Sequence, residues 1–502
     1  MPPPDRYVDV ELLEAEEEPD RAEEHSATGV PPWRRRLWPA EGWSRRRWTA
    51  GVVVLALALA VAVVAQDGSV TARSARLERA VGLVTDLGRP LVEAWRVPGG
   101  YPLGVVGDVV LTSTADGGGA QALAAADGTV RWRSPDDGGS CQLLVRPGVE
   151  ARRFGYGWPS VGELGTEHVR VLCVGSTVVG PSWSATRRSA ARVLDVATGE
   201  QLAAVSVDSA TASSWVVEED VVLSGTDASG RWTALRWSPW TGRTGWVHRS
   251  AEPVVDPGGP MPWSDVSQTW MRVGGSHPDA ISLVTGESLD PSVPPSAVSW
   301  VAEPVTSTLP GGVRVVAVPG ADGASYVEVR DPAGAVRFTT PGEPLVAPVD
   351  DLSVPDLLVV RRPRDGALAG VDLLGGSVRW QSPRPSPYTW PLARADGTLL
   401  LTDGTDVVAI DLRDGAELWR VDPGDAGPSG IVTDGSLVLV AEPDVAAPAL
   451  VSLVARGARD GLERWRQGAP GRQSFLAALR DGSVLVVTGS QVVALRPPPS
   501  RQ

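Results

Sequence analysis

The sequence contains no lysine and no asparagine, and it has only two cysteines and four histidines among 502 residues. Two thiols are too few for a disulfide framework, or for a zinc site with three or four side-chain ligands. The histidines form no His-x-His or HExxH pattern, and no Gly-x-Ser-x-Gly elbow or phosphate-binding glycine loop is present. We therefore expect no catalytic residues and no bound metal.

Acidic residues outnumber basic residues, by 60 to 46. The formal net charge is −14, and residues 1–48 account for −3 of it, so the remainder of the chain carries −11. An acidic folded region gains nothing from counterion release on a phosphate backbone, which argues against nucleic-acid binding. Apolar residues make up 42% and charged residues 21% of the chain, which is typical of a folded protein.

The first 30 residues are poor in the large apolar residues that a folded core needs. Residues 1–32 are acidic, and we expect a disordered cytoplasmic tail. Residues 33–48 hold two arginine triplets, Arg34–Arg36 and Arg45–Arg47, interleaved with tryptophans. Because this segment precedes an apolar run, we expect its arginines to contact membrane lipid.

Residues 49–66 are the one long apolar run, and they predict a transmembrane helix. Six arginines precede the run closely and three follow it, which predicts a cytoplasmic N-terminus and an extracytoplasmic remainder in a single-pass cell-membrane protein. The ending Val63-Val64-Ala65 also suits a cleaved signal peptide, although the charged leader is long for one. Residues 67–90 are expected to form a linker.

Beyond Leu91, short runs rich in valine, leucine and alanine recur between Asp-Gly turns, and no long helix is indicated. One unit repeats: an apolar run, often an acid, and then Gly-x-x-x-Trp. Its clearest copies are Leu123–Trp132, Leu368–Trp380, Val407–Trp419 and Val454–Trp465, with looser ones ending at Trp246 and Phe338. Copies around Gly199 and Gly286 keep the turn but lack the aromatic residue.

The unit predicts an all-β propeller. Glycine accepts the positive φ of a hairpin turn, and the aromatic residue four positions later can pack between neighbouring sheets. We expect residues 91–496 to form four-stranded blades, eight in number with seven or nine left open, followed by a tail at 497–502. The residues expected to dock between blades are Trp95, Trp132, Trp246, Phe338, Trp380, Trp419 and Trp465.

The two ends of the repeat region are expected to share a blade. Residues 484–487 and 492–495 read as two strands that lack a tryptophan-bearing neighbour, whereas Leu91–Val97 is such a strand without a predecessor. Pairing them would close the ring and remove its open edge.

These copies resemble the pyrroloquinoline-quinone-like (PQQ-like) propeller repeat, with its Ala-x-Asp-x-x-x-Gly-x-x-x-Trp docking motif. The quinoprotein dehydrogenases of this family use adjacent cysteines, and a calcium ion held by Glu, Asn and Asp. Here the two cysteines are 32 residues apart and asparagine is absent, so the resemblance implies no quinone cofactor. The chain is more similar to the non-enzymatic assembly-factor propellers of the outer membrane, although no lipid-modified cysteine precedes its repeats.

Cys141 and Cys173 fall within one long unit, each in a candidate strand, and a disulfide between them is plausible outside the cytoplasm. The alternative is two small buried apolar side chains. For function, we expect a non-catalytic scaffold that binds a protein or an envelope component through its loops. A solute-binding sensor that signals through the tail is the alternative, and an enzyme with an unrecognised acid–base site is a third.

Overall fold

The computed structural model describes residues 83–499 with several interruptions, the longest at 292–305. Four of the expected segments lie outside the described residues: the N-terminal tail, the two arginine triplets, the predicted transmembrane helix and most of the linker. In the part that is described, no helix is long and apolar enough to cross a membrane.

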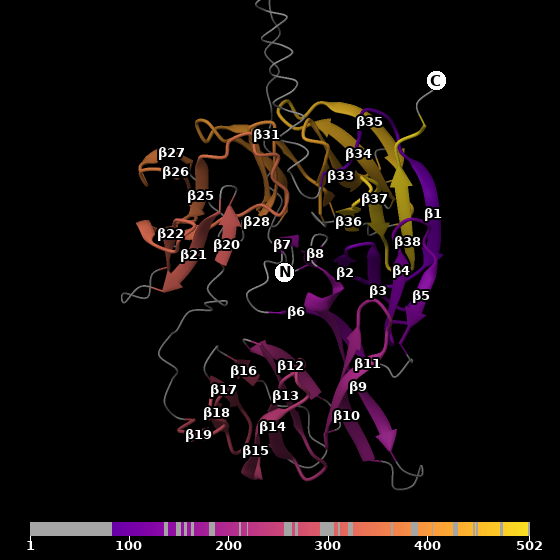
Figure 1. Cartoon of the computed structure of the whole chain (residues 1–502), viewed down its shortest axis with the longest axis vertical. Helices are drawn as coiled ribbons and strands as arrows, with labels where there is room; N and C mark the ends of the chain where they lie inside the picture. The colour runs from indigo at the N-terminus through magenta and orange to yellow at the C-terminus, as the bar shows by residue number, and fades with distance from the viewer. Residues whose placement is uncertain are drawn as a thin grey trace, which may run out of the picture. The chain divides into compact units, whose positions relative to one another are not determined.

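The described residues form nine antiparallel sheets of four sequential strands, apart from an insertion and a closing strand treated below (Figure 1). The first three run through β2 (Pro102–Val106), β3 (Val109–Ser113), β4 (Ala120–Ala124), β5 (Val130–Arg133); β6 (Ser140–Val145), β9 (Val169–Val179), β10 (Thr186–Asp195), β11 (Gln201–Val207); and β12 (Ala212–Val217), β13 (Asp220–Thr226), β14 (Arg231–Trp237), β15 (Thr244–Pro253).

The next three sheets contain β16 (Ser264–Val266), β17 (Trp270–Val273), β18 (Asp279–Ser282), β19 (Ser288–Leu289); β20 (Thr306–Leu309), β21 (Val313–Pro319), β22 (Ser325–Arg330), β23 (Val336–Pro341); and β24 (Glu343–Pro344), β25 (Leu357–Arg361), β26 (Leu368–Asp372), β27 (Val378–Ser382). Then follow β28 (Trp390–Ala395), β29 (Thr398–Thr402), β30 (Val407–Asp411), β31 (Glu417–Val421); and β32 (Val432–Thr433), β33 (Leu437–Pro443), β34 (Val451–Gly457), β35 (Glu463–Gly468).

The ninth sheet joins the two ends of the repeat region. It has the order β1-β38-β37-β36, in which β1 (Val92–Pro98) pairs antiparallel with β38 (Gln491–Arg496), next to β37 (Val484–Val487) and β36 (Phe475–Ala478). In Figure 1 the indigo strand β1 lies beside the yellow strand β38. The predicted sharing of one blade by the two ends is confirmed.

Nine sheets are one more than the eight blades expected, and nine was the upper of the alternatives left open. The difference arises between Trp246 and Phe338, the residues at which the two looser copies of the repeat unit end. It forms two sheets, β16–β19 and β20–β23, because each half has its own glycine turn, at Gly286 and Gly334.

The apolar core is divided into eight clusters of buried residues, and each cluster joins two neighbouring sheets. Among the described residues, one pair of neighbours shares no such cluster: β16–β19 and β20–β23. Strands expose two faces with a period of two residues, so each sheet buries one face against each neighbour. Stacking is therefore what stabilises an individual sheet.

One insertion pairs with a sheet other than the one that contains its flanking strands. Between β6 and β9 the chain forms β7 (Arg152–Phe154), β8 (Trp158–Val161) and the 3₁₀ turn Thr166–His168. Strand β8 pairs in parallel with β2, which makes the neighbouring sheet six-stranded. The hairpin therefore covers the free side of β2, the first strand of that sheet.

Candidate functional site

Six of the boundaries between neighbouring sheets, here called joints, share one geometry. The aromatic ring from the last strand of one sheet lies on the turn glycine of the next. A Cβ built on Gly128 would come 2.6 Å from the Trp95 ring, and one built on Gly415 would come 2.5 Å from the Trp380 ring. The same contact joins Trp132 to Gly199, Trp246 to Gly286, Phe338 to Gly376 and Trp419 to Gly461. These glycines have φ between +66° and +76°, where other residues are strained.

Each docked indole also donates a hydrogen bond. Trp95 Nε1–H donates to the carbonyl oxygen of Ala125 at 2.9 Å, and Trp380 Nε1–H donates to that of Leu412 at 2.8 Å. In both cases the acceptor lies three residues before the turn glycine. Trp132, Trp246 and Trp419 follow the same rule, with acceptors Val196, Leu283 and Ala458. Burying the indole therefore leaves no unpaired donor.

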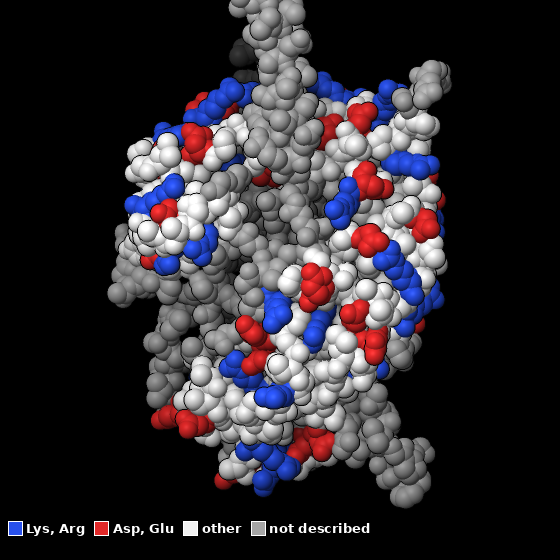
Figure 2. Space-filling model, in the orientation of Figure 1, with Lys and Arg blue, Asp and Glu red and all other residues white. Residues whose placement is uncertain are grey.

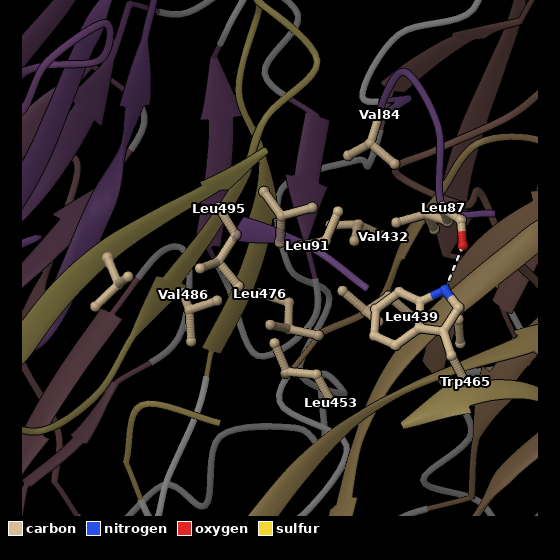
Figure 3. Packing of buried hydrophobic residues seen from close by; sticks show 13 residues of the cluster. Val84, Leu87, Leu91, Val432, Leu439, Leu453, Trp465, Leu476, Val486 and Leu495 are labelled. Carbon is tan, nitrogen blue, oxygen red and sulfur yellow. Dashed lines mark hydrogen bonds between the residues drawn. The ribbon is translucent and has the colours of Figure 1, made fainter. Parts of the chain in front are cut away.

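At the joint that closes the ring, between β32–β35 and the ninth sheet, the indole donates the same kind of hydrogen bond to a different acceptor. The ninth sheet is built from both ends of the repeat region, so it has no turn between its third and fourth strands. The carbonyl oxygen of Leu87 takes the place of the turn carbonyl and accepts from Trp465 Nε1–H at 2.5 Å (Figure 3). Val84, Leu87 and Leu91 are buried in the same cluster as Trp465.

Residues 83–91 are therefore a part of the propeller, and we call them the strap. Val84 N–H donates to the carbonyl oxygen of Thr433, and Leu87 N–H donates to a carboxylate oxygen of Asp434, both at 2.9 Å. The expected linker at 67–90 thus needs correction at its C-terminal end. Its apolar residues Val84 and Leu87 are buried because they complete the joint that lacks a turn.

At two joints, none of the described aromatic residues lies on the turn glycine. At the joint between β6/β9–β11 and β12–β15, a Cβ built on Gly242 would come 3.8 Å from the Cβ of Ala203, and the buried indole of Trp237 comes instead from the following sheet. At the joint between β16–β19 and β20–β23, a Cβ on Gly334 would meet only the guanidinium of Arg314 within its own sheet. We call this second one the undocked joint.

The sheets present two different ends. The hairpin face carries the turns after the first and third strands of each sheet, including the docking glycines and the strap. The loop face carries the turns after the second strand and the connections between sheets. Exposed aromatic residues lie on the loop face: Tyr101 is 70% exposed before β2, and Trp390 is 49% exposed at the start of β28.

On the face that Figure 2 shows, blue basic residues and red acidic residues are interspersed. On the loop face, Arg420 Nη1 lies 2.6 Å from carboxylate oxygens of both Asp403 and Asp406. Partial burial raises the pKa of Asp403, but the backbone N–H of Asp406 and the Arg420 guanidinium outweigh it and lower the pKa to about 2. At this place on the loop face, acidic and basic side chains are therefore paired.

The structure contains a disulfide between Cys141 on β6 and Cys173 on β9, which lie directly opposite each other in the sheet. It closes the base of the insertion that holds β7 and β8. Of the histidines, His248 is buried, and its Nε2 lies 2.8 Å from a carboxylate oxygen of Asp279 across a joint. Among the described residues, no three His, Cys, Asp or Glu side chains gather to hold a metal ion.

A cavity of about 380 Å³ lies between β6 and β12, near their loop-face ends. Sequence reasoning missed it, because its walls come from two repeats and carry no motif. The lining residues are Ser140, Cys141, Gln142, Val174, Ser213 and Ser214.

Comparison with known proteins supports the repeat type. Residues 403–497 match the model of the family described as outer membrane protein assembly factor BamB. The repeats are PQQ-like, and the fold is a β-propeller. No curated protein matches the sequence.

Solved structures resemble the chain at low identity. BamB from Moraxella catarrhalis is 13% identical, with 81% of this chain and 100% of that chain covered and a TM-score of 0.36. A quinohemoprotein alcohol dehydrogenase from Pseudomonas putida HK5 is 14% identical, with 82% and 78% covered and a TM-score of 0.31. The computationally designed Ika8 protein is 14% identical, with 74% and 98% covered and a TM-score of 0.30.

Proposed function

We propose that this chain is a non-catalytic propeller scaffold that binds a protein or another envelope component through its loop face. The observation that carries the proposal is the difference between the hairpin face and the loop face. The hairpin face is occupied by docked turns and by the strap, whereas the loop face exposes Tyr101 and Trp390. Tyrosine and tryptophan are the residue types that most often dominate protein interfaces.

The match of residues 403–497 to an assembly-factor family supports a scaffold that works by binding. We further propose that the propeller lies outside the cytoplasm and is held at the membrane by residues 49–66. The Cys141–Cys173 disulfide supports this location, because such bonds persist in oxidising compartments. The arginine asymmetry around the apolar run supports the same orientation.

Site-specific photo-crosslinking in intact cells tests the working face. A photo-reactive aromatic amino acid is placed in the full-length chain at Tyr101 or at Trp390. Matched controls carry it at Leu374 or Leu462, which are 78% and 59% exposed at turns of the hairpin face. We expect one recurrent crosslinked partner from the loop-face positions and none from the controls. Crosslinks only from Leu374 and Leu462 would contradict the proposal.

A further inference from the structure

The cavity between β6 and β12 has walls that point to one class of ligand. Strand β6 is the terminal strand of its sheet, and β12 is the terminal strand of the next one. Each is the first strand of its sheet, so two neighbouring strand edges border the cavity. Terminal strands present backbone N–H and C=O groups that no neighbouring strand pairs. The site therefore offers backbone as well as side-chain hydrogen-bonding groups.

The polar side chains in this wall are neutral and available. Ser140, Gln142, Ser213 and Ser214 supply three hydroxyls and one carboxamide. Among the described residues, none of these four side chains has a hydrogen-bond partner. Hydroxyls and amides can both donate and accept, which is what a ligand with several hydroxyl groups requires.

The remaining wall is apolar and fixed. Val174 and the Cys141–Cys173 disulfide provide a small apolar surface beside the polar groups. The disulfide also ties β6 to β9, so the two strands that hold Ser140, Gln142 and Val174 are covalently joined. A partly preformed wall reduces the ordering cost of binding.

The volume of the cavity and the charge of its lining limit the kinds of ligand that could bind there. A volume of about 380 Å³ is at the lower end of the range for small-molecule sites, so it suits a single ring better than a polymer segment. None of the described residues that line it is charged, so an ionised ligand would lose hydration without a compensating partner among them. We propose that this cavity binds a neutral, polyhydroxylated small molecule of the monosaccharide class, in addition to the scaffold function of the loop face.

Isothermal titration of the full-length chain in detergent tests the proposal with three probes: glucose, N-acetylglucosamine and glucose 6-phosphate. We expect at least one neutral sugar to bind, and glucose 6-phosphate to bind at least about tenfold more weakly than glucose. Gln142→Leu and Ser214→Ala should each weaken binding about tenfold, since each removes one hydrogen bond to the ligand.

The matched control is Ser206→Ala on β11, which is exposed and outside the cavity wall, and it should leave affinity unchanged. Thermal unfolding of every variant separates loss of binding from loss of fold. The proposal is overturned if neither neutral sugar binds at 50-fold excess over a roughly millimolar dissociation constant. It is also overturned if folded Gln142→Leu and Ser214→Ala bind as tightly as Ser206→Ala, or if glucose 6-phosphate binds as well as glucose.

Discussion

The joint between β28–β31 and β32–β35 and the joint between β16–β19 and β20–β23 belong to the same propeller but are held differently. In the first, the Trp419 ring lies on Gly461, its N–H reaches Ala458, and a buried cluster spans both sheets. In the second, none of the described aromatic residues reaches Gly334, and the described residues share no buried cluster. A docked aromatic ring and a shared buried cluster thus distinguish the first joint from the second.

The contrast extends to the outer strands. Strand β31 has five residues, whereas β19 has two, Ser288 and Leu289, and Leu289 is 43% exposed. A short last strand cannot carry the aromatic residue to the neighbouring turn. We therefore expect the ring to open first at the undocked joint.

Removing a docked indole is the change that we expect to lower the free energy of unfolding most. Trp465→Ala should lower the free energy of unfolding by about 3–5 kcal/mol, because it leaves a cavity at the closing joint and removes the bond to Leu87. Urea denaturation followed by tryptophan fluorescence measures the loss. Trp390→Ala removes an indole that is 49% exposed, and it should cost less than about 1 kcal/mol. Equal losses for the two variants would refute the role assigned to docking.

A second test concerns the sheet whose outer strand carries Ala203 in place of an aromatic residue. The disulfide closes a loop with a sequence separation of 32 residues in that sheet. Replacing both cysteines by serine should cost roughly 3–4 kcal/mol, through the added entropy of the unfolded chain. Thermal unfolding with and without reductant measures it. Reductant should destabilise only the natural chain. An effect of reductant on the double variant would show that the loss does not come from the disulfide.

A third test compares two turn glycines. Gly415→Ala would place a Cβ 2.5 Å from the Trp380 ring at a φ of +76°, and should cost about 2–3 kcal/mol. Gly334→Ala meets only the end of the Arg314 side chain at a φ of +96°, so it should cost about 1–2 kcal/mol from backbone strain alone. Chemical denaturation of both variants gives the difference. A larger loss at Gly334 would mean that the undocked joint is tighter than we infer.

The smallest expected effect comes from the ion pairs. The pKa of Asp403 is about 2 in the folded chain, below its ordinary value of 3.8. Its stabilisation is therefore present above about pH 4 and is lost as the pH falls from there towards 2. Asp403→Asn should cost about 1 kcal/mol at pH 7 and show a weaker decline in stability below pH 4. If the variant and the natural chain lose stability in parallel there, Asp403 is not the group responsible.

Several parts of this structure could be predicted from the sequence because they repeat. The Gly-x-x-x-Trp unit indicated an all-β propeller, and the unmatched strand around Trp95 indicated that both ends share one sheet. The family resemblance added the name of the repeat. These features are local in sequence, so the turn and the aromatic residue can be read together.

Features that depend on single, non-repeating contacts could not be predicted. The strap has no motif, because Leu87 contributes only a carbonyl oxygen and an apolar side chain to the Trp465 joint. The number of sheets between Trp246 and Phe338 was left open by the sequence, because the copy around Gly286 lacks the aromatic residue and its last strand, β19, has two residues. The cavity between β6 and β12 joins residues about 70 positions apart, such as Gln142 and Ser214, and only the fold brings them together.

Hydrogen–deuterium exchange of the full-length chain, read by mass spectrometry, tests the central claim most directly. Amide protection reports the free energy of local opening. If aromatic docking holds the ring, amides in β17 and β21, on either side of the undocked joint, should exchange well before those in β29 and β33. Trp419→Ala should bring β29 and β33 close to the same rate. Protection of β17 and β21 equal to that of β29 and β33 in the natural chain would contradict the account.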